Sequence, residues 1–180
     1  MRRTILLWVM VLSLSHVAAQ HEVGSISFQP KVGFNIASLT DLPETGTGLI
    51  AGLECEHQVL EPLSLSWGAM YSAQGTSYYG LKFDYLIVPF LVNFYPLKGL
   101  ALKFGLQPGF SLNSWKDIQG GWFSVRRIEA NTLELSVPLG LSYEFHHFKV
   151  DVRYLFGVTD VFERYDHKYR VWQFSLAYAI

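Results

Sequence analysis

The sequence has few of the features that stabilise ordinary secreted or soluble domains. It contains one cysteine, Cys55, so no disulfide can form within the chain. Only 16% of its 180 residues are charged, against about a quarter in soluble domains. The 14 basic and 15 acidic residues nearly cancel, so the chain lacks the positive charge that attracts nucleic acid. Nucleic acid is therefore not an expected partner.

The first nineteen residues have the pattern of a secretory signal peptide. Arg2 and Arg3 precede an apolar run from Ile5 to Leu14, and the small residues of Val17–Ala19 allow cleavage before Gln20. The apolar run is too short for the alternative, an N-terminal membrane anchor. We therefore expect residues 1–19 to be removed on export and residues 20–180 to form one domain.

Long hydrophobic runs are missing from residues 20–180. The most apolar stretch, residues 85–97, is interrupted by Pro89, Asn93 and Pro96 and is shorter than the roughly 20 residues of a membrane-spanning helix. Yet 50% of the chain is hydrophobic. Backbone polar groups in lipid must be paired internally, which only helices and closed barrels achieve. An exported, charge-poor chain without a helical span therefore favours a transmembrane β-barrel.

What the sequence does contain is alternation. Eight segments place apolar and polar residues in turn, as a strand with one apolar face requires. In the last of them, Trp172, Phe174 and Leu176 alternate with Gln173 and Ser175. The expected strands cover approximately residues 26–39, 49–59, 63–74, 83–95, 100–112, 133–145, 148–159 and 171–180.

The connections between these segments alternate in length. Those after the second, fourth and sixth segments are tight, and the others are longer, including a loop over residues 114–131. Outer-membrane barrels have short periplasmic turns and longer external loops. The predicted fold is therefore all-β, an eight-stranded antiparallel up-and-down transmembrane β-barrel with both ends of the domain on the periplasmic side. Proline removes a ladder donor, so Pro30, Pro89, Pro108 and Pro138 predict bulges or strand ends.

The apolar face is predicted to contact lipid. The alternative is a soluble barrel with that face inward, but eight strands enclose a space that side chains just fill, and the large residues would overpack it. Aromatic residues also gather near both strand ends, as in interfacial girdles. At the turn end they are Phe94, Tyr95, Tyr143, Phe145, Phe148 and Tyr178, and at the loop end Phe34, Tyr71, Phe83, Phe110, Phe156 and Trp172.

The opposite face then carries the charges of the lumen. These are Lys31, Glu54, Glu56, Lys103, Glu134, Glu144, Lys149, Asp151 and Arg153. Four cations against five anions are nearly balanced, and buried charges must pair. We expect a self-neutralising network that plugs the lumen. The alternative is a narrow ion path, which would normally show an excess of one sign.

Four stretches, together with the closing residues 169–178, resemble a known family. The stretches are residues 31–39, residues 63–66 with 71–75, residues 84–92 and residues 148–160. They are similar to the outer-membrane beta-barrel domain family labelled porin-family or PorT-like and common in Bacteroidetes. The resemblance implies an eight-stranded outer-membrane barrel without catalytic residues, and one PorT-type class assists a protein secretion system. Ile87 departs from the family pattern, which often has an inward Glu there.

The sequence offers little for catalysis, metal or cofactor binding. An outer-membrane lipid A-modifying enzyme would need a hydroxyl beside a histidine oriented by a carboxylate, and the best candidates are His167 with Asp166 and either Ser124 or Ser77. His57, His146 and His147 provide no closed set of metal ligands. We therefore expect no catalytic, cofactor or metal site.

The predicted long external loop is the best candidate for contact with partners. It carries Trp115, Trp122, Phe123, Arg126 and Arg127. Exposed aromatic residues with arginines are typical of binding surfaces, and arginines can also bind the phosphates of lipopolysaccharide. These residues could equally pack on the barrel rim. The expected role is structural or interaction-based, with a small passive porin or a secretion-accessory barrel as alternatives.

Overall fold

The structure of this protein is a computed structural model that describes residues 22–39, 45–76, 81–117, 125–127, 133–158 and 169–180. The expected signal peptide, the loop residues Trp122 and Phe123, and the candidate residues Ser77, Ser124, Asp166 and His167 lie outside these ranges. No helix among the described residues is long and apolar enough to cross a membrane.

Ten β-strands account for nearly all of the described chain. They are β1 (Ile26–Leu39), β2 (Thr45–Leu60), β3 (Leu63–Thr76), β4 (Leu81–Ile87), β5 (Phe90–Leu97), β6 (Leu100–Asp117), β7 (Val125–Arg127), β8 (Leu133–Phe145), β9 (Phe148–Gly157) and β10 (Tyr169–Tyr178). Each of the eight predicted segments is a strand or a pair of strands, because the period-two alternation matches the pleat.

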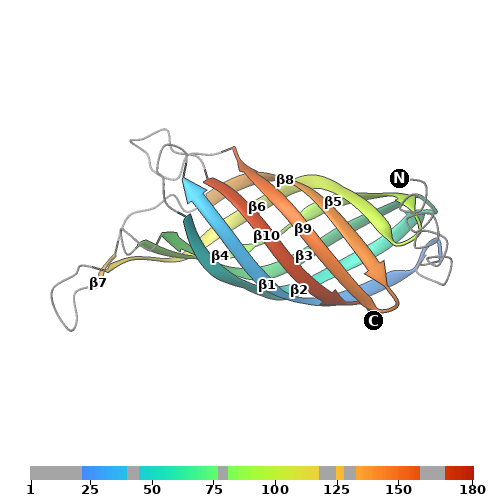
Figure 1. Cartoon of the computed structure of the whole chain (residues 1–180), viewed down its shortest axis with the longest axis horizontal. Helices are drawn as coiled ribbons and strands as arrows, with labels where there is room; N and C mark the ends of the chain where they lie inside the picture. Colours follow the sequence, from blue (N-terminus) through green and yellow to red (C-terminus); the bar gives the residue numbers. More distant parts are fainter. Residues whose placement is uncertain (1–21, 40–44, 77–80, 118–124, 128–132, 159–168) are drawn as a thin grey trace, which may run out of the picture.

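The strands close into a barrel (Figure 1). Around the barrel, β1 pairs with β2, and β2 pairs with β3. β3 pairs with both β4 and β5, and each of these pairs with β6. β6 pairs with β8, β8 with β9, and β9 with β10, which pairs with β1 and closes the ring. All of these pairings are antiparallel. Since β4 and β5 are two halves of one barrel strand and β7 lies outside the ring, the barrel has eight strands. The predicted fold class is confirmed.

The break between β4 and β5 has a local cause in two prolines. Val88 donates to the Pro108 carbonyl of β6 at 2.9 Å, and Gly68 of β3 donates to the Pro89 carbonyl at 3.3 Å. Neither proline has an N–H to return the bond. Two adjacent positions therefore each lose one bond of the usual reciprocal pair, and the regular ladder stops.

Three of the four prolines lie inside continuous strands, which corrects the prediction that each would mark a bulge or a strand end. Pro30 pairs with Leu53, Pro138 with Leu155 and Pro108 with Leu135, all inside continuous strands. Each of these strands continues through its proline, although the β6–β8 ladder has a gap beside Pro138, between the pairs Phe104–Leu139 and Gln107–Ser136. A strand is interrupted where two losses of a backbone hydrogen bond coincide.

The tight turns lie at one end of the barrel. Two-residue connections join β2 to β3, β5 to β6 and β8 to β9. The last of these holds His146 at a φ of 55°, and Gly99 in the β5–β6 turn has a φ of 78°. The C-terminus lies at this same end, since Ala179 donates to the His147 carbonyl at 2.6 Å.

At the opposite end one sheet continues beyond the barrel, which corrects the predicted loop over residues 114–131. β6 extends to Asp117 and pairs there with β4 on one side and with the short β7 on the other. Figure 1 shows β7 well outside the barrel, away from the C-terminus. We call this part of the sheet, residues 81–84, 113–117 and 125–127, the outer extension.

The apolar rows face outward around the barrel. Phe90, Phe104, Leu139 and Val150 are each more than 50% exposed, which is far from what a soluble protein tolerates in a continuous belt. Tyr95 is an exception to the predicted girdle at the turn end. It shares the inward parity of Asn93 in β5 and is buried in the lumen.

Candidate functional site

The inward faces of the strands bring most of the predicted lumen charges into one buried network. Eight of the nine are less than 5% exposed: Lys31, Glu54, Glu56, Lys103, Glu144, Lys149, Asp151 and Arg153. They come from five strands, β1, β2, β6, β8 and β9. The network divides into a central cluster and a second cluster nearer the tight turns.

The central cluster surrounds two carboxylates with three cations. Glu54 lies 2.7 Å from the Arg153 guanidinium, 3.0 Å from Lys31 Nζ and 3.4 Å from Lys103 Nζ. Asp151 lies 2.8 Å from Arg153, 2.8 Å from Lys103 and 3.2 Å from Lys31. Each cation thus bridges both carboxylates, and the side chains of all five residues are inaccessible to solvent.

The second cluster reverses this balance, with one cation between two carboxylates. Lys149 Nζ lies 2.6 Å from Glu56 and 2.9 Å from Glu144. The central cluster has three cations for two anions, and the second cluster has one cation for two anions. Four positive and four negative charges therefore face each other inside the barrel.

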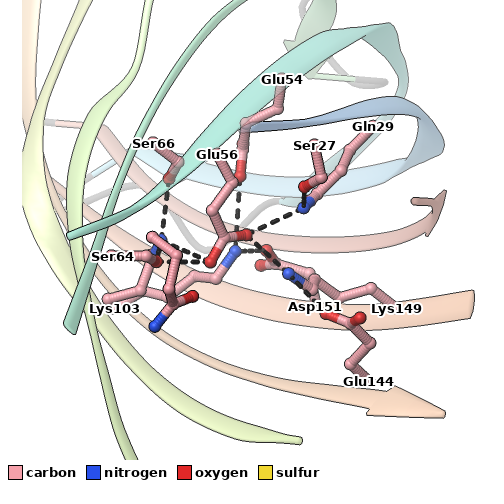
Figure 2. Close-up of polar contacts among 12 residues, drawn as sticks. Ser27, Gln29, Glu54, Glu56, Ser64, Ser66, Lys103, Glu144, Lys149 and Asp151 are labelled. Carbon is pink, nitrogen blue, oxygen red and sulfur yellow. Dashed lines mark hydrogen bonds and ion pairs between the residues drawn. The ribbon is translucent and has the colours of Figure 1, made fainter. Parts of the chain in front are cut away.

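Neutral polar side chains complete the coordination of Glu56 (Figure 2). Gln29 donates to its Oε2 at 2.9 Å, and Asn93 donates to its Oε1 at 3.2 Å. Ser64 and the Tyr95 hydroxyl also donate to Oε1. Charged hydrogen bonds of this kind offset part of the several kcal/mol that burying each ion costs.

The sequence prediction did not include these neutral partners. The parity of β1, β3 and β5 places Gln29, Ser64 and Asn93 inward, so the signal was available. That they meet at one carboxylate follows from barrel register, which alternation alone does not determine.

Glu134 stands apart from the other predicted lumen charges. It is the second residue of β8, at the end of the barrel away from the tight turns, and a side-chain hydrogen bond joins it to Tyr85. Its strand partner is Gly109, which pairs in turn with Ile87. The described ion pairs do not include Glu134, so the structure separates it from the network.

Apolar side chains fill part of the lumen on that outer side. Ile50, Met70, Ile87, Leu155 and Val171 are all buried with at most 4% exposure. Ile87, the departure from the resemblance noted above, belongs to this group and pairs with Met70. The inward face is therefore ionic in the middle and toward the turns, and partly hydrocarbon toward the extension.

Neutral polar residues in the lumen add a contact across the barrel. Asn35 of β1 donates to the Ser72 hydroxyl of β3 at 2.8 Å, and both are buried. Ser136 donates to the Gln107 carbonyl at 3.1 Å. The lumen is thus crossed by side chains at several levels.

The described residues show no cluster of histidine, cysteine and carboxylate side chains that could hold a metal ion. His146 and His147 lie in the β8–β9 turn, and His147 stacks on Tyr178 with ring centroids 5.6 Å apart. Cys55 has a free thiol on β2.

Three of the five predicted contact residues lie on the strands of the outer extension. Trp115 lies on β6 opposite Arg127 of β7, and Lys116 lies opposite Arg126. On the other side of β6, Trp115 faces Lys82 and Lys116 faces Leu81 of β4. The sequence prediction placed Trp115, Arg126 and Arg127 in one loop but did not include Lys82, because only the strand register brings β4 beside this part of β6.

A comparison with known protein families identifies the family of the chain. Residues 18–163 match the model of the outer membrane protein beta-barrel domain family. The chain therefore belongs to a class of transmembrane β-barrels of the bacterial outer membrane. Within that class it is a member of the outer membrane protein beta-barrel domain family. No curated protein sequence matches the chain.

Solved structures show the same architecture at low sequence identity. Neisserial surface protein A is 14% identical, with a TM-score of 0.58 over 87% of this chain and 99% of that chain. Ail, the attachment invasion locus protein of Yersinia pestis, is 15% identical, with a TM-score of 0.56 over 88% of this chain and 99% of that chain. OprG of Pseudomonas aeruginosa is 12% identical, with a TM-score of 0.50 over 89% and 98%. At these identities the likeness establishes the fold.

Proposed function

We propose that this protein is a sealed outer-membrane barrel with a structural or interaction role, whose lumen is plugged by the paired charges. The observation that carries the proposal is the central cluster, in which five charged side chains from four strands meet with no solvent-accessible side-chain surface. An ion crossing the lumen would have to displace these contacts. Each displaced charge would be left unpaired in a low-dielectric interior, at a cost of several kcal/mol.

Planar-bilayer recording tests the sealed lumen. The purified protein, reconstituted at the density that gives clear steps with a general porin, should give no steady single-channel currents. A matched preparation of Glu54→Gln should leak more often, because three cations then share one carboxylate. Steady, large steps from the unmodified barrel would refute the proposal and favour the small passive porin.

Processing and orientation complete the proposal. Residues 1–19 act as a signal peptide that is removed, and residues 20–180 form the mature barrel. The tight turns lie in the periplasm and the outer extension lies outside the cell, in keeping with the short periplasmic turns of outer-membrane barrels. The N-terminal sequence of the mature protein, read by mass spectrometry, should begin at Gln20.

The interaction role is assigned to the outer side. The residues proposed to contact lipopolysaccharide or a protein partner are Trp115, Trp122, Phe123, Arg126 and Arg127. Membership of a PorT-like group with a secretion-accessory role is a narrower version of this proposal. Cross-linking in whole cells, with and without deletion of residues 119–127, tests it. A protein captured only by the intact chain supports a partner, and an identical cross-link pattern contradicts one.

A non-enzymatic role is part of the same proposal. The lipid A-modifying alternative depends on His167 as the base that activates a hydroxyl. His167→Ala should therefore leave the acylation pattern of lipid A unchanged, as read by mass spectrometry. A changed pattern would reinstate the enzyme.

A further inference from the structure

Three neighbouring strands bring together polar side chains that the charge network of the lumen does not use. β1, β10 and β9 lie side by side (Figure 1), and Asn35, Gln173 and Arg153 are directly opposite one another in their ladders. Residues directly opposite one another in a sheet share a face. All three are at most 1% exposed, so the shared face is the inner one. We call these three residues the polar row.

Each residue of the polar row has at least one hydrogen-bonding atom without a partner among the described residues. Arg153 donates from Nε and Nη2 to Asp151 and from Nη2 to Glu54, but its Nη1 is unpaired. Neither amide atom of Gln173 is paired, and neither is Asn35 Oδ1. Burying polar atoms without partners is costly, and nearly all such atoms in proteins are paired. Their concentration in one row therefore indicates a bound ligand.

The residues on either side of the polar row show what kind of ligand fits. Toward the outer extension, the next inward positions of the same three strands hold small or apolar residues, Ala37, Val171 and Leu155, which are at most 4% exposed. Toward the tight turns they hold Gly33, Ser175 and Asp151. The Ser175 hydroxyl is also buried and unpaired. A ligand of the polar row would thus be small and enclosed by protein.

The charge balance around the polar row favours an anion. Arg153 belongs to the central cluster, in which three cations face two carboxylates. The carboxylates that offset this excess, Glu56 and Glu144, pair with Lys149 in the second cluster. Along β9, Lys149 and Arg153 lie on opposite sides of Asp151. The polar row is therefore on the positive side of the central cluster, away from the offsetting carboxylates.

From this placement we infer that the polar row binds one small monovalent anion, such as chloride, between Arg153 Nη1 and the Gln173 amide. A guanidinium and a carboxamide both provide N–H donors, and hydrogen bonds to a charged acceptor are the stronger kind. Asn35 can add a third donor. Its amide donates to the Ser72 hydroxyl at 2.8 Å, and turning the amide over keeps that contact because a hydroxyl can also donate.

A water molecule is the alternative occupant, since water pairs with donors and acceptors alike. Water would satisfy the same atoms but would leave the excess positive charge of the central cluster unbalanced. An anion does both. The inference concerns occupancy of the lumen and goes beyond the proposal that the lumen is sealed.

Retention of bromide tests the site, because bromide replaces chloride and is absent from the protein itself. The side chains of the central cluster are inaccessible to solvent, so the ion must be present while the barrel forms. The purified protein is unfolded in urea, refolded into detergent in sodium bromide and desalted. Elemental mass spectrometry should then find about one bromide for each chain.

Three substitutions separate the polar row from the rest of the lumen. Gln173→Leu should reduce retained bromide at least about tenfold, the factor expected for losing one hydrogen bond to a charged group. Gln173→Glu should also release bromide, because its carboxylate takes the place of the anion opposite Arg153. Gln29→Leu is the matched control. It makes the same change at a buried glutamine whose amide donates to Glu56 at 2.9 Å, and it should retain bromide within about twofold.

Heat-modifiable migration on SDS gels checks that every variant is folded, and crystals of the refolded protein kept in bromide locate the ion. The inference predicts a bromine anomalous peak in contact with Arg153 Nη1 and Gln173. It is overturned if the unmodified protein retains no bromide, or if Gln173→Leu and Gln29→Leu retain it equally. Ordered water at the polar row without a bromine peak, or peaks at the surface only, would also overturn it.

The outcome is independent of the proposed function. The bromine peak is read in crystals that contain bromide throughout, so it does not require a closed lumen. A barrel that conducts ions and shows the peak would refute only the sealed lumen. A barrel that does not conduct and shows no peak would refute only the anion site.

Discussion

At the scale of single residues, the charged side chains in the lumen are expected to have the largest effect on the stability of the barrel. A buried ion pair gains little over a well-packed apolar pair, but removing one partner leaves an uncompensated charge. Glu54 pairs with Lys31, Lys103 and Arg153 at once. Removing its charge should therefore leave three cations, from three strands, each with one ion-pair partner fewer.

Glu54→Gln is predicted to destabilise the barrel by about 3–5 kcal/mol. The measurement is urea-induced unfolding in lipid vesicles, followed by tryptophan fluorescence. Glu61→Gln, at an exposed carboxylate in the β2–β3 turn, is the control and should change stability by less than about 0.5 kcal/mol. Combining Glu54→Gln with Lys103→Met should recover part of the loss, since one unpaired cation is removed. Equal effects of Glu54→Gln and Glu61→Gln would contradict the network.

At the scale of strands, the outward and inward faces of each strand meet different environments. Outward positions meet hydrocarbon, and an arginine near the membrane midplane costs about 2–4 kcal/mol there, but only about 0–1 near the interface. Leu139 lies in the middle of β8, and Leu60 is the last residue of β2, beside a tight turn. Both are more than 50% exposed in the barrel itself.

Leu139→Arg should impair assembly far more than Leu60→Arg. The difference should appear as a lower yield of heat-modifiable barrel in the outer membrane and as a lower unfolding free energy in vesicles. The two variants make the same chemical change, one in the middle of a barrel strand and the other at the end of a strand beside a turn. Equal tolerance of both would count against the lipid-facing assignment.

Orientation is also a property of strands and their connections. A short epitope inserted between Lys98 and Gly99, in a tight turn, should be unreachable by antibody on intact cells. The same epitope after Gly120, between β6 and β7, should be labelled. Labelling of the Lys98–Gly99 insertion alone would show that the barrel is inserted the other way round.

At the scale of the whole molecule, alternation was enough to predict the barrel, because the period-two pattern reflects the pleat and one apolar face implies one apolar solvent. It could not predict which lumen residues meet. Glu54 and Arg153 are 99 positions apart, and their contact depends on how far each strand is shifted against the next. The shift is a property of the closed ring.

The local sequence also could not predict features that depend on the pairing of two strands. Each proline predicted an interruption, yet the ladder stops where Pro89 and Pro108 act on neighbouring positions. The outer extension was missed for a similar reason. Residues 114–117 and 125–127 do not alternate clearly, and their strand character depends on pairing with each other.

The apolar outer surface of the barrel requires hydrocarbon around it, and this requirement can be measured directly. The purified chain of residues 20–180 should therefore be transferred from denaturant into plain buffer and, in parallel, into detergent, and its mass and circular dichroism measured. We predict a folded monomer in detergent and aggregated chains in buffer, because a continuous apolar belt would face water. A stable, folded monomer in detergent-free buffer would contradict the account.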